Sequence, residues 1–266
     1  MSPGVAQAGA LPSAVRSLTA QETGLVQGSL HSWDISTGVD GPGTRFVVRT
    51  AGCPLRCIYC HDPDTWRMRA GERVTADQVL SRMERYVPYL RAACGGVTAS
   101  GGEPLLQSRF TEAVLAGAKA RGLHTALDTA GTLGERAGDG LLAATDLVLL
   151  DFKAADEALH RRLTGGSLTP TLAFAERLAT IGKPTWVRFV VVPGHTDAPE
   201  HVRALARRVA GLDNVDRVEV LGYHRLGREK YAALGLPDLL PGVPGATPEQ
   251  IREAREIFAE AGLVVA

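Results

Sequence analysis

Three cysteines stand within eight positions of this 266-residue chain, and their number and spacing limit the chemistry that they could support. In the stretch AGCPLRCIYCHDPDTW, Cys53, Cys57 and Cys60 are spaced C-x3-C-x2-C. A disulfide would leave one of these thiols over, and a structural zinc site, which takes four protein ligands, would be one ligand short. Cys57 and Cys60 alone have the C-x-x-C spacing of a redox pair, which leaves Cys53 unexplained.

An iron–sulfur cluster accounts for three cysteines better than these alternatives do. A 4Fe-4S cluster normally takes four thiolates, one for each iron. With three thiolates, one iron keeps an open coordination position, where a substrate or cofactor can bind as it does at a catalytic zinc. Spacing alone leaves two alternatives open, a catalytic zinc site that includes the adjacent His61 and a redox pair.

The overall composition gives no reason to expect nucleic-acid or membrane binding. Lys and Arg together number 29, as do Asp and Glu, so the formal net charge is zero. No apolar run approaches the roughly 20 residues of a membrane span, and residues 1–27 lack the hydrophobic middle of a secretory signal. We therefore expect a cytoplasmic protein with reduced thiols and a disordered tail over residues 1–27. We also expect a monomer. The fourth cysteine, Cys94, is expected to be an ordinary buried one.

Strands and helices are predicted to alternate after this tail. Apolar, β-branched runs predict six strands, at residues 45–50, 96–100, 123–129, 146–153, 185–193 and 215–224. Helical periodicity predicts helices at residues 75–90, 108–121, 156–163, 170–181, 198–210 and 248–261, with Thr75 and Ser108 as N-caps. Continuous apolar strands that alternate with helices indicate a parallel sheet. We expect an α/β fold, an open, partial β/α barrel in one domain over residues 28–266, with a doubly wound sheet as the competing architecture.

Polar or glycine-rich residues directly follow all six predicted strands. In chain order they are the cysteine loop, SGGEP at residues 100–104, Asp128 with Thr129, Asp151 with Lys153, residues 193–195, and Tyr223 with His224. Because the carboxyl ends of parallel strands meet at one edge of a sheet, these residues are predicted to converge on one cavity. Each also has a plainer interpretation taken singly. The aspartates could cap helices, and Lys153 and His224 could be a solvated charge and a structural histidine.

Two of these motifs together resemble those of the radical S-adenosylmethionine enzymes. Tyr59 precedes the last cysteine of C-x3-C-x2-C, and SGGEP follows about 40 residues later, where its glycines allow backbone to approach a ligand closely. The resemblance implies a partial or full α/β barrel, a 4Fe-4S cluster on the three cysteines, and S-adenosylmethionine at the open iron. It further implies that an electron from the cluster cleaves the cofactor to methionine and a 5′-deoxyadenosyl radical.

Longer stretches resemble one subfamily, the glycyl-radical-enzyme activating enzymes, and among them those that act on pyruvate formate-lyase. HSWDISTGVDGPGTRFVV, GLHTALDTAG, TDLVLLDFK and GYHRLG are among the matching stretches. The resemblance implies a radical oxidoreductase that abstracts a Cα hydrogen from a glycine of pyruvate formate-lyase and receives electrons from a flavodoxin- or ferredoxin-like donor. Another glycyl radical enzyme as the substrate, and a zinc-binding structural protein, are the alternatives.

The resemblance also implies roles for individual residues. S-adenosylmethionine is expected to contact Tyr59, Cys60, His61, Gly102, Glu103, Asp151, Lys153 and His224. A monovalent cation is expected at Asp128, Thr129, the backbone of Leu149, and Asp151. Asp40 matches an aspartate placed near the substrate glycine, which makes it the predicted catalytic residue. Three departures from the subfamily pattern, Asp62, Pro104 and Gly222, touch no cluster ligand but leave the partner less defined than the chemistry.

Overall fold

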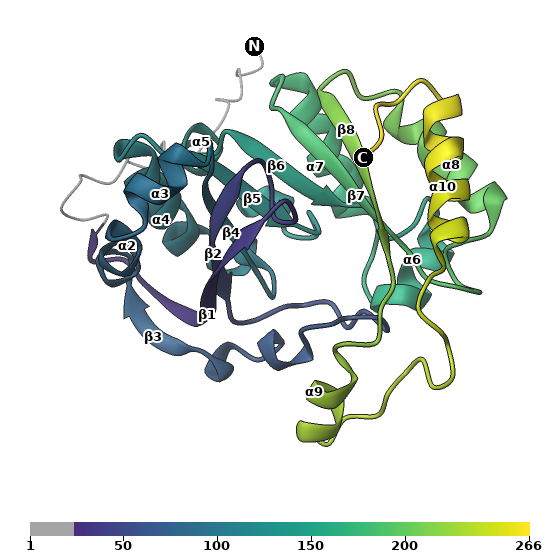
Figure 1. Ribbon diagram of the computed structural model, residues 1–266, viewed down its shortest axis with the longest axis horizontal. Coiled ribbons are helices and arrows are strands. Elements are labelled where there is room, and N and C mark those ends of the chain that lie inside the picture. The colour runs from purple at the N-terminus through teal and green to yellow at the C-terminus, as the bar shows by residue number, and fades with distance from the viewer. Residues whose placement is uncertain (1–23) are drawn as a thin grey trace, which may run out of the picture.

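One curved sheet of eight strands forms the centre of the molecule (Figure 1). The computed structural model describes residues 24–266, so residues 1–23 of the predicted tail lie outside the described part. The strand order is β3-β1-β2-β4-β5-β6-β7-β8. The strands are β1 Gln27–Thr37, β2 Thr44–Thr50, β3 Glu72–Thr75, β4 Gly96–Gly101, β5 His124–Thr129, β6 Leu147–Asp151, β7 Thr185–Val191 and β8 Val215–Gly222.

The six predicted strands are confirmed and run parallel as neighbours, from β2 to β8. Because their order follows the chain without a reversal, the sheet winds as a barrel does and not as a doubly wound sheet. It stays open, since β3 and β8 form its two edges. The antiparallel strands β1 and β3 were not predicted. Most of β1 is half-buried or exposed, so it lacks the continuous apolar run that marks the inner strands.

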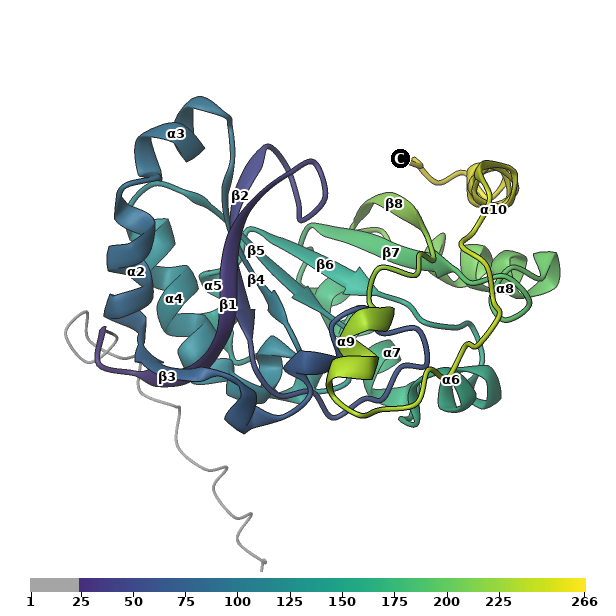
Figure 2. The ribbon, with the colours of Figure 1, turned by 60° about the horizontal axis from the view of Figure 1, so that its bottom comes forward.

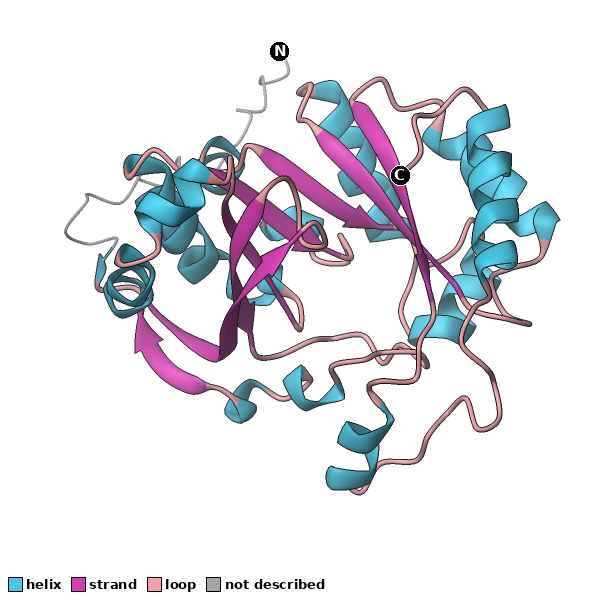
Figure 3. Cartoon of the chain, in the orientation of Figure 1, coloured by secondary structure: helices cyan, strands magenta, loops and turns pink. Residues whose placement is uncertain are grey.

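The helices pack outside the sheet (Figures 2 and 3). The α-helices are α2 Ala76–Glu84, α3 Val87–Ala92, α4 Ser108–Ala120, α5 Asp139–Ala143, α6 Glu157–Thr164, α7 Thr169–Thr180, α8 Pro199–Val209, α9 Arg228–Ala233 and α10 Pro248–Glu260. Short 3-10 helices are η1 Pro63–Thr65, η2 Met68–Ala70, η3 Pro104–Gln107 and η4 Gly134–Arg136. No helix within residues 24–266 is long and apolar enough to cross a membrane.

Three local expectations need correction. The helix predicted over residues 75–90 keeps its Thr75 cap but is interrupted after Glu84, because Pro88 has no N–H to donate to the Glu84 carbonyl. Ser108 is not a cap, since η3 runs directly into α4 and Ser108 already has helical dihedral angles. Cys94 is exposed and not buried, because it follows α3 in a left-handed turn with φ of 47°.

Side chains of the inner strands point alternately to the two faces of the sheet and join two different apolar clusters. Leu127, Val148 and Leu150 belong to the main core beneath the helices. Leu149 and Trp186 belong to a small separate cluster. Side chains of a strand alternate between the faces of the sheet, so this second cluster lies on the inner face. The apolar packing thereby supports the polar residues that follow the strands.

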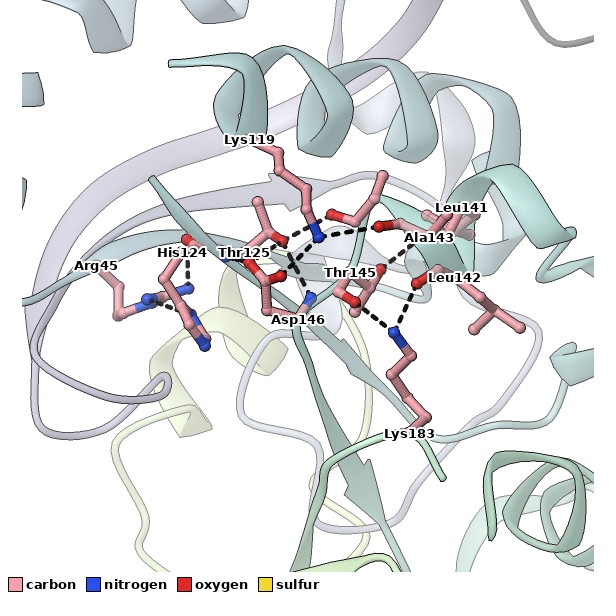
Figure 4. Close-up of polar contacts among 11 residues, drawn as sticks. Arg45, Lys119, His124, Thr125, Leu141, Leu142, Ala143, Thr145, Asp146 and Lys183 are labelled. Atoms are coloured by element: carbon pink, nitrogen blue, oxygen red, sulfur yellow. Dashed lines mark hydrogen bonds and ion pairs between the residues drawn. The ribbon is translucent and has the colours of Figure 1, made fainter. Parts of the chain in front are cut away.

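A polar network closes the opposite, amino-terminal end of β5 and β6 (Figure 4). Asp146 accepts a hydrogen bond from the Thr125 backbone N–H at 2.9 Å and pairs with the Lys119 ammonium at 2.6 Å. Lys183 donates to the carbonyls of Leu142 and Thr145 at 2.8 and 2.7 Å. These contacts tie the turn before β6 to the start of β5.

Replacing Asp146 with alanine is expected to reduce the free energy of unfolding by about 1–3 kcal/mol, because it leaves the N–H of buried Thr125 without its acceptor. Asp146→Asn keeps an acceptor oxygen and loses only a half-exposed ion pair, so its effect should be smaller. Denaturant unfolding of both variants is the measurement. Equal losses would contradict the assigned hydrogen bond.

Candidate active site

A cavity of about 430 Å³ opens at the carboxyl ends of the parallel strands, and we call it the cysteine pocket. Its lining includes Cys53, Cys57, Cys60, Ser100, Gly102, Asp128, Thr129, Asp151, Lys153, Arg188, Tyr223 and His224. The predicted convergence of residues that follow the strands is therefore confirmed for five of the six strands. For β7 the lining residues are Arg188 and Val190, within the strand, and not the predicted residues 193–195.

The cysteine loop is closed on itself by backbone hydrogen bonds near its base. The N–H of Gly52 donates to the carbonyl of Thr65 at 2.6 Å, and that of Cys53 donates to Trp66 at 3.2 Å. The loop also contacts the segment after β4, where the N–H of Glu103 donates to the carbonyl of Gly52 at 2.8 Å. The two sequence motifs are therefore joined directly through their backbones.

The end of helix α6 holds the other side of the loop. The N–H groups of Arg56 and Ile58, on either side of Cys57, donate to the carbonyls of Thr164 and Leu163 at 2.8 and 2.9 Å. These carbonyls belong to the last turn of a helix, where backbone acceptors lack partners within the helix. A segment about 100 residues further along the chain thereby positions Cys57, and no cysteine motif indicates it.

The three thiols fit a cluster of several metal ions better than one ion. They are free and line one cavity. Yet in residues 24–266 no three His, Cys, Asp or Glu side chains are grouped as ligands of a single ion such as zinc. Ligands of an iron–sulfur cluster bind different irons and need not meet at one point. Burial raises the pKa of Cys53 and Cys57 to about 12 and also raises that of Cys60, so metal binding must displace their protons.

Asp151 and Lys153 form a half-buried ion pair in the pocket wall. The Lys153 Nζ lies 2.6 Å from Asp151 Oδ2 and 5.8 Å from the centre of the Tyr59 ring. Burial alone disfavours the ammonium, but the Asp151 carboxylate holds the pKa of Lys153 well above its ordinary value. The hydroxyl of Tyr59 is buried and has no hydrogen-bond partner among the described residues. A fixed cation, an anion and an open hydroxyl therefore lie beside the cysteines, which suits a zwitterionic cofactor.

Arg188, on β7, was not predicted as a site residue. Its guanidinium lies 3.2 Å from both Asp128 Oδ1 and Glu219 Oε2, and only 7% of the side chain is exposed. Ser100 donates to the other oxygen of Asp128 at 2.7 Å. The available signal was an arginine inside the apolar run TWVRFVVV, because an unpaired charge is rarely buried in a strand. Arg188 thus adds a positive charge to the pocket lining and pairs with one carboxylate oxygen of Asp128.

The predicted cation site is only partly assembled in this cavity. Asp128, Thr129 and Asp151 line it, while the fully buried Leu149 does not. Leu149 lies between β5 and β7 in the sheet, paired with Asp128 and Trp186. The cation site remains a prediction.

Glu103 is 1% exposed and is not among the residues that line the pocket, so its predicted cofactor contact remains a prediction. Its carboxylate accepts hydrogen bonds from the hydroxyl of Thr129 at 2.6 Å and from the N–H groups of Ala130 and Leu105, each at 3.1 Å. Gly102 does line the pocket. Glu103 therefore holds the backbone after β5 in place, while Gly102 is the residue of this motif that a ligand in the pocket can contact.

Glu103 should make stability depend on pH. Burial raises the pKa of Glu103 from about 4.5 to about 7 against the effect of its hydrogen bonds. Between these values the folded state keeps a proton that the unfolded state has lost, so this group makes stability fall as pH rises, and its effect is constant above pH 7. Relative to Glu103→Gln, whose amide does not titrate, the free energy of unfolding should fall by about 3 kcal/mol across this window. Denaturant unfolding of both proteins at several pH values is the measurement. If the stability of the unmodified protein relative to Glu103→Gln rose with pH, the prediction would be contradicted.

Asp40, which is 9% exposed, lines the pocket from the loop between β1 and β2. Its carbonyl accepts from the hydroxyl of Thr98 at 2.6 Å, and Arg188 donates to the carbonyl of Val39 next to it. Fully buried Arg45 donates to the carbonyl of Pro42 at 3.4 Å. The loop is thus held by its backbone, which leaves the Asp40 side chain for the pocket.

His61 and His224 lie together in the pocket lining, with ring centres 5.5 Å apart. His61 pairs with Asp62 at 3.0 Å, and Lys230 of α9 contacts Asp62 and Asp64. Both histidines line the pocket, so the structure brings together all the predicted cofactor contacts except Glu103. Their individual roles remain predictions.

Comparisons with known proteins agree with this geometry. A model of the Radical SAM superfamily matches residues 47–207. The pyruvate formate-lyase-activating enzyme of Staphylococcus epidermidis is 44% identical over 237 residues, which cover 86% of this chain and 94% of that protein. The enzyme of the same name from Staphylococcus aureus is 42% identical over the same shares.

Two solved structures share the fold. A domain of a pyruvate-formate lyase-activating enzyme from Bacteroides vulgatus has a TM-score of 0.54 at 23% identity, covering 65% of this chain and 98% of that chain. A radical SAM methyltransferase from Sphaerobacter thermophilus has a TM-score of 0.59 at 16% identity, covering 87% of this chain and 71% of that chain.

The open parallel sheet, the three-cysteine pocket and the matching model define a radical SAM protein. Such proteins use a 4Fe-4S cluster together with S-adenosylmethionine. Within that class, identity above 40% over nearly the whole of its relatives places the chain in the family of pyruvate formate-lyase-activating enzymes.

Proposed function

We propose that this chain activates pyruvate formate-lyase by generating a glycyl radical on it. The observation that carries the proposal is a pocket in which three cysteines meet the polar ends of the parallel strands, in a chain 44% identical to an enzyme of that name. Cys53, Cys57 and Cys60 would hold the 4Fe-4S cluster. When bound, the cluster and S-adenosylmethionine together supply a 5′-deoxyadenosyl radical that takes a hydrogen atom from the substrate.

The protein's own residues would bind and orient the cofactor. Lys153 and Asp151 present a fixed pair of opposite charges to its carboxylate and amine. Gly102 lets the backbone approach the methionine end, while Tyr59 and the two histidines, His61 and His224, flank the adenosyl end. The cavity, of about 430 Å³, is of ligand-binding size.

The open barrel suits a protein substrate. A glycine within a polypeptide can reach the pocket only if chain can enter from outside, and the open sheet allows this. Asp40 lines the pocket beside Val39, which is 56% exposed. We infer that the glycine segment enters over this loop and that Asp40 positions it.

An anaerobic assay tests the proposal. The reconstituted chain, reduced and mixed with S-adenosylmethionine and pyruvate formate-lyase, should give the electron-paramagnetic-resonance signal of a glycyl radical. Omitting the cofactor should remove the signal. Cofactor cleavage without a glycyl signal would overturn the substrate but not the chemistry, and other glycyl radical enzymes would then be assayed. Size-exclusion chromatography of the same sample tests the expected monomer.

A further inference from the structure

A second cavity, of about 400 Å³, lies against the outer side of the cysteine loop, and we call it the outer pocket. One wall is the cysteine loop, with Arg56, Trp66 and Arg67, and the other is α9 and the segment after it, with Tyr231, Leu234 and Leu239. Figure 1 shows α9 at the lower edge of the molecule, away from the helices that cover the sheet, and α9 contacts the η1 turn of the cysteine loop.

The two walls are fixed to each other by specific contacts. Lys230 forms ion pairs with Asp62 and Asp64 of the cysteine loop. The rings of Tyr231 and Trp66 meet edge to face, with centres 5.9 Å apart. The outer pocket is therefore a built feature and not a gap between loosely placed segments.

Trp66 is the part shared by the two cavities, since it lines both the outer pocket and the cysteine pocket. On the inner side it lines the cysteine pocket together with Cys60. On the outer side, the Arg56 guanidinium lies 5.0 Å from the centre of the Trp66 ring. One aromatic side chain thus separates the outer surface from a cluster ligand.

Most acidic residues of the two walls are already paired, since Asp62 and Asp64 contact Lys230 and Asp238 contacts Arg228, while Glu229 of α9 is exposed. Arg56, Arg67 and Arg69 are exposed, and none forms an ion pair with another residue of the described part of the chain. The pocket lining contains two arginines and no acidic residue. Its rim is apolar as well, since Leu234 and Leu239 are 47% and 46% exposed. An acidic partner with an apolar contact group fits such a surface.

The proposed reaction needs one electron from outside for each cofactor that is cleaved. The mouth of the cysteine pocket must admit the glycine segment of the substrate, so the electron has to arrive over another face. The outer pocket is the second cavity beside the cysteine loop, and its charge favours the weak, electrostatically steered contact typical of electron carriers.

We propose that the outer pocket is the docking surface for an acidic one-electron carrier of the flavodoxin class, and that its electron enters past Trp66. This inference rests on the proposed function. The carrier would lose one electron to the 4Fe-4S cluster that Cys53, Cys57 and Cys60 would hold, and no covalent bond would form or break between the two proteins. The charge of Arg67 and Arg69 steers the encounter, while Leu234 and Leu239 contact the apolar surface of the carrier.

Charge reversal tests the docking surface on the reconstituted holoenzyme. The double variant Arg67→Glu, Arg69→Glu should bind a purified flavodoxin about tenfold or more weakly at low ionic strength. Its binding should also depend less on salt than that of the unmodified protein. Isothermal titration gives the affinities, and stopped-flow absorbance gives the rate of cluster reduction by flavodoxin hydroquinone. The matched control is Arg203→Glu, Arg207→Glu, which reverses two exposed arginines on α8 that pair with no described residue.

The outcomes separate this inference from the proposed function. Iron content and reduction by dithionite, a small reductant, should be unchanged in the Arg67/Arg69 variant. Equal flavodoxin affinity in this variant and in the control would overturn the docking surface. Dithionite-reduced, unmodified protein that yields no glycyl radical would instead overturn the proposed function. A Leu234→Asp variant is a second probe, and unchanged flavodoxin affinity there would overturn the apolar contact.

Discussion

Replacing Cys57 with alanine is expected to abolish cluster retention and, with it, glycyl radical formation. Cys57 lines the pocket between Arg56 and Ile58, whose backbones are held by the end of α6, so its position is determined on both sides. Two remaining thiols cannot hold three corners of a cluster. After anaerobic reconstitution the variant should carry little iron, and the broad absorbance of the cluster should be lost.

The matched control is Cys94→Ala, which removes the fourth cysteine. Cys94 is exposed at the end of α3 and lies outside the pocket lining. It should retain the iron content and the glycyl radical yield of the unmodified protein. Loss of iron in both variants would show that thiol number, and not the three positions, decides cluster assembly.

Replacing Gly102 with alanine is expected to cause the second large loss, in binding of S-adenosylmethionine. A Cβ at this position would lie 2.3 Å from the carbonyl oxygen of Gly52 and 3.2 Å from that of Thr65. Both are backbone atoms of the cysteine loop and cannot rotate away as a side chain can. The segment after β4 must therefore move from the loop, which breaks the contact that joins the two motifs.

We expect the affinity for S-adenosylmethionine to fall about tenfold or more, and stability to fall by about 1–3 kcal/mol, the usual cost of overpacking. Equilibrium binding and denaturant unfolding measure the two effects. Gly211→Ala is the control, since its nearest neighbour would be the carbonyl oxygen of Arg208 at 3.4 Å, an ordinary contact. Unchanged binding in Gly102→Ala would show that the two motifs need not touch.

The strongly periodic parts of the fold could be predicted from the sequence. Six strands with continuous apolar runs appear where expected. A strand that is buried on both faces has apolar residues at successive positions, and this run can be recognised in the sequence. Strand β1 was missed because the contacts of its half-exposed residues depend on β2 and β3, which pair with it. The helix over residues 75–90 was predicted too long because its apolar periodicity continues past the position where Pro88 interrupts it.

The site could be predicted in part. The three cysteines and the polar residues after the strands were found because parallel strands bring their carboxyl ends to one edge. The side-chain direction of Glu103 was not found, because Thr129 and two backbone N–H groups turn it inward. Arg188 was overlooked, and its role depends on Asp128 and Glu219, which lie on neighbouring strands.

The sequence by itself determined the chemistry of this protein: three thiols, their spacing, and the order of strands that carries polar residues to one rim. Local spacing and periodicity are properties of the chain alone. Only the tertiary structure decided what supports the cysteine loop, through α6 on one side and α9 on the other. These contacts join residues about 100 to 170 positions apart, and the packing of the whole molecule determines which of them meet.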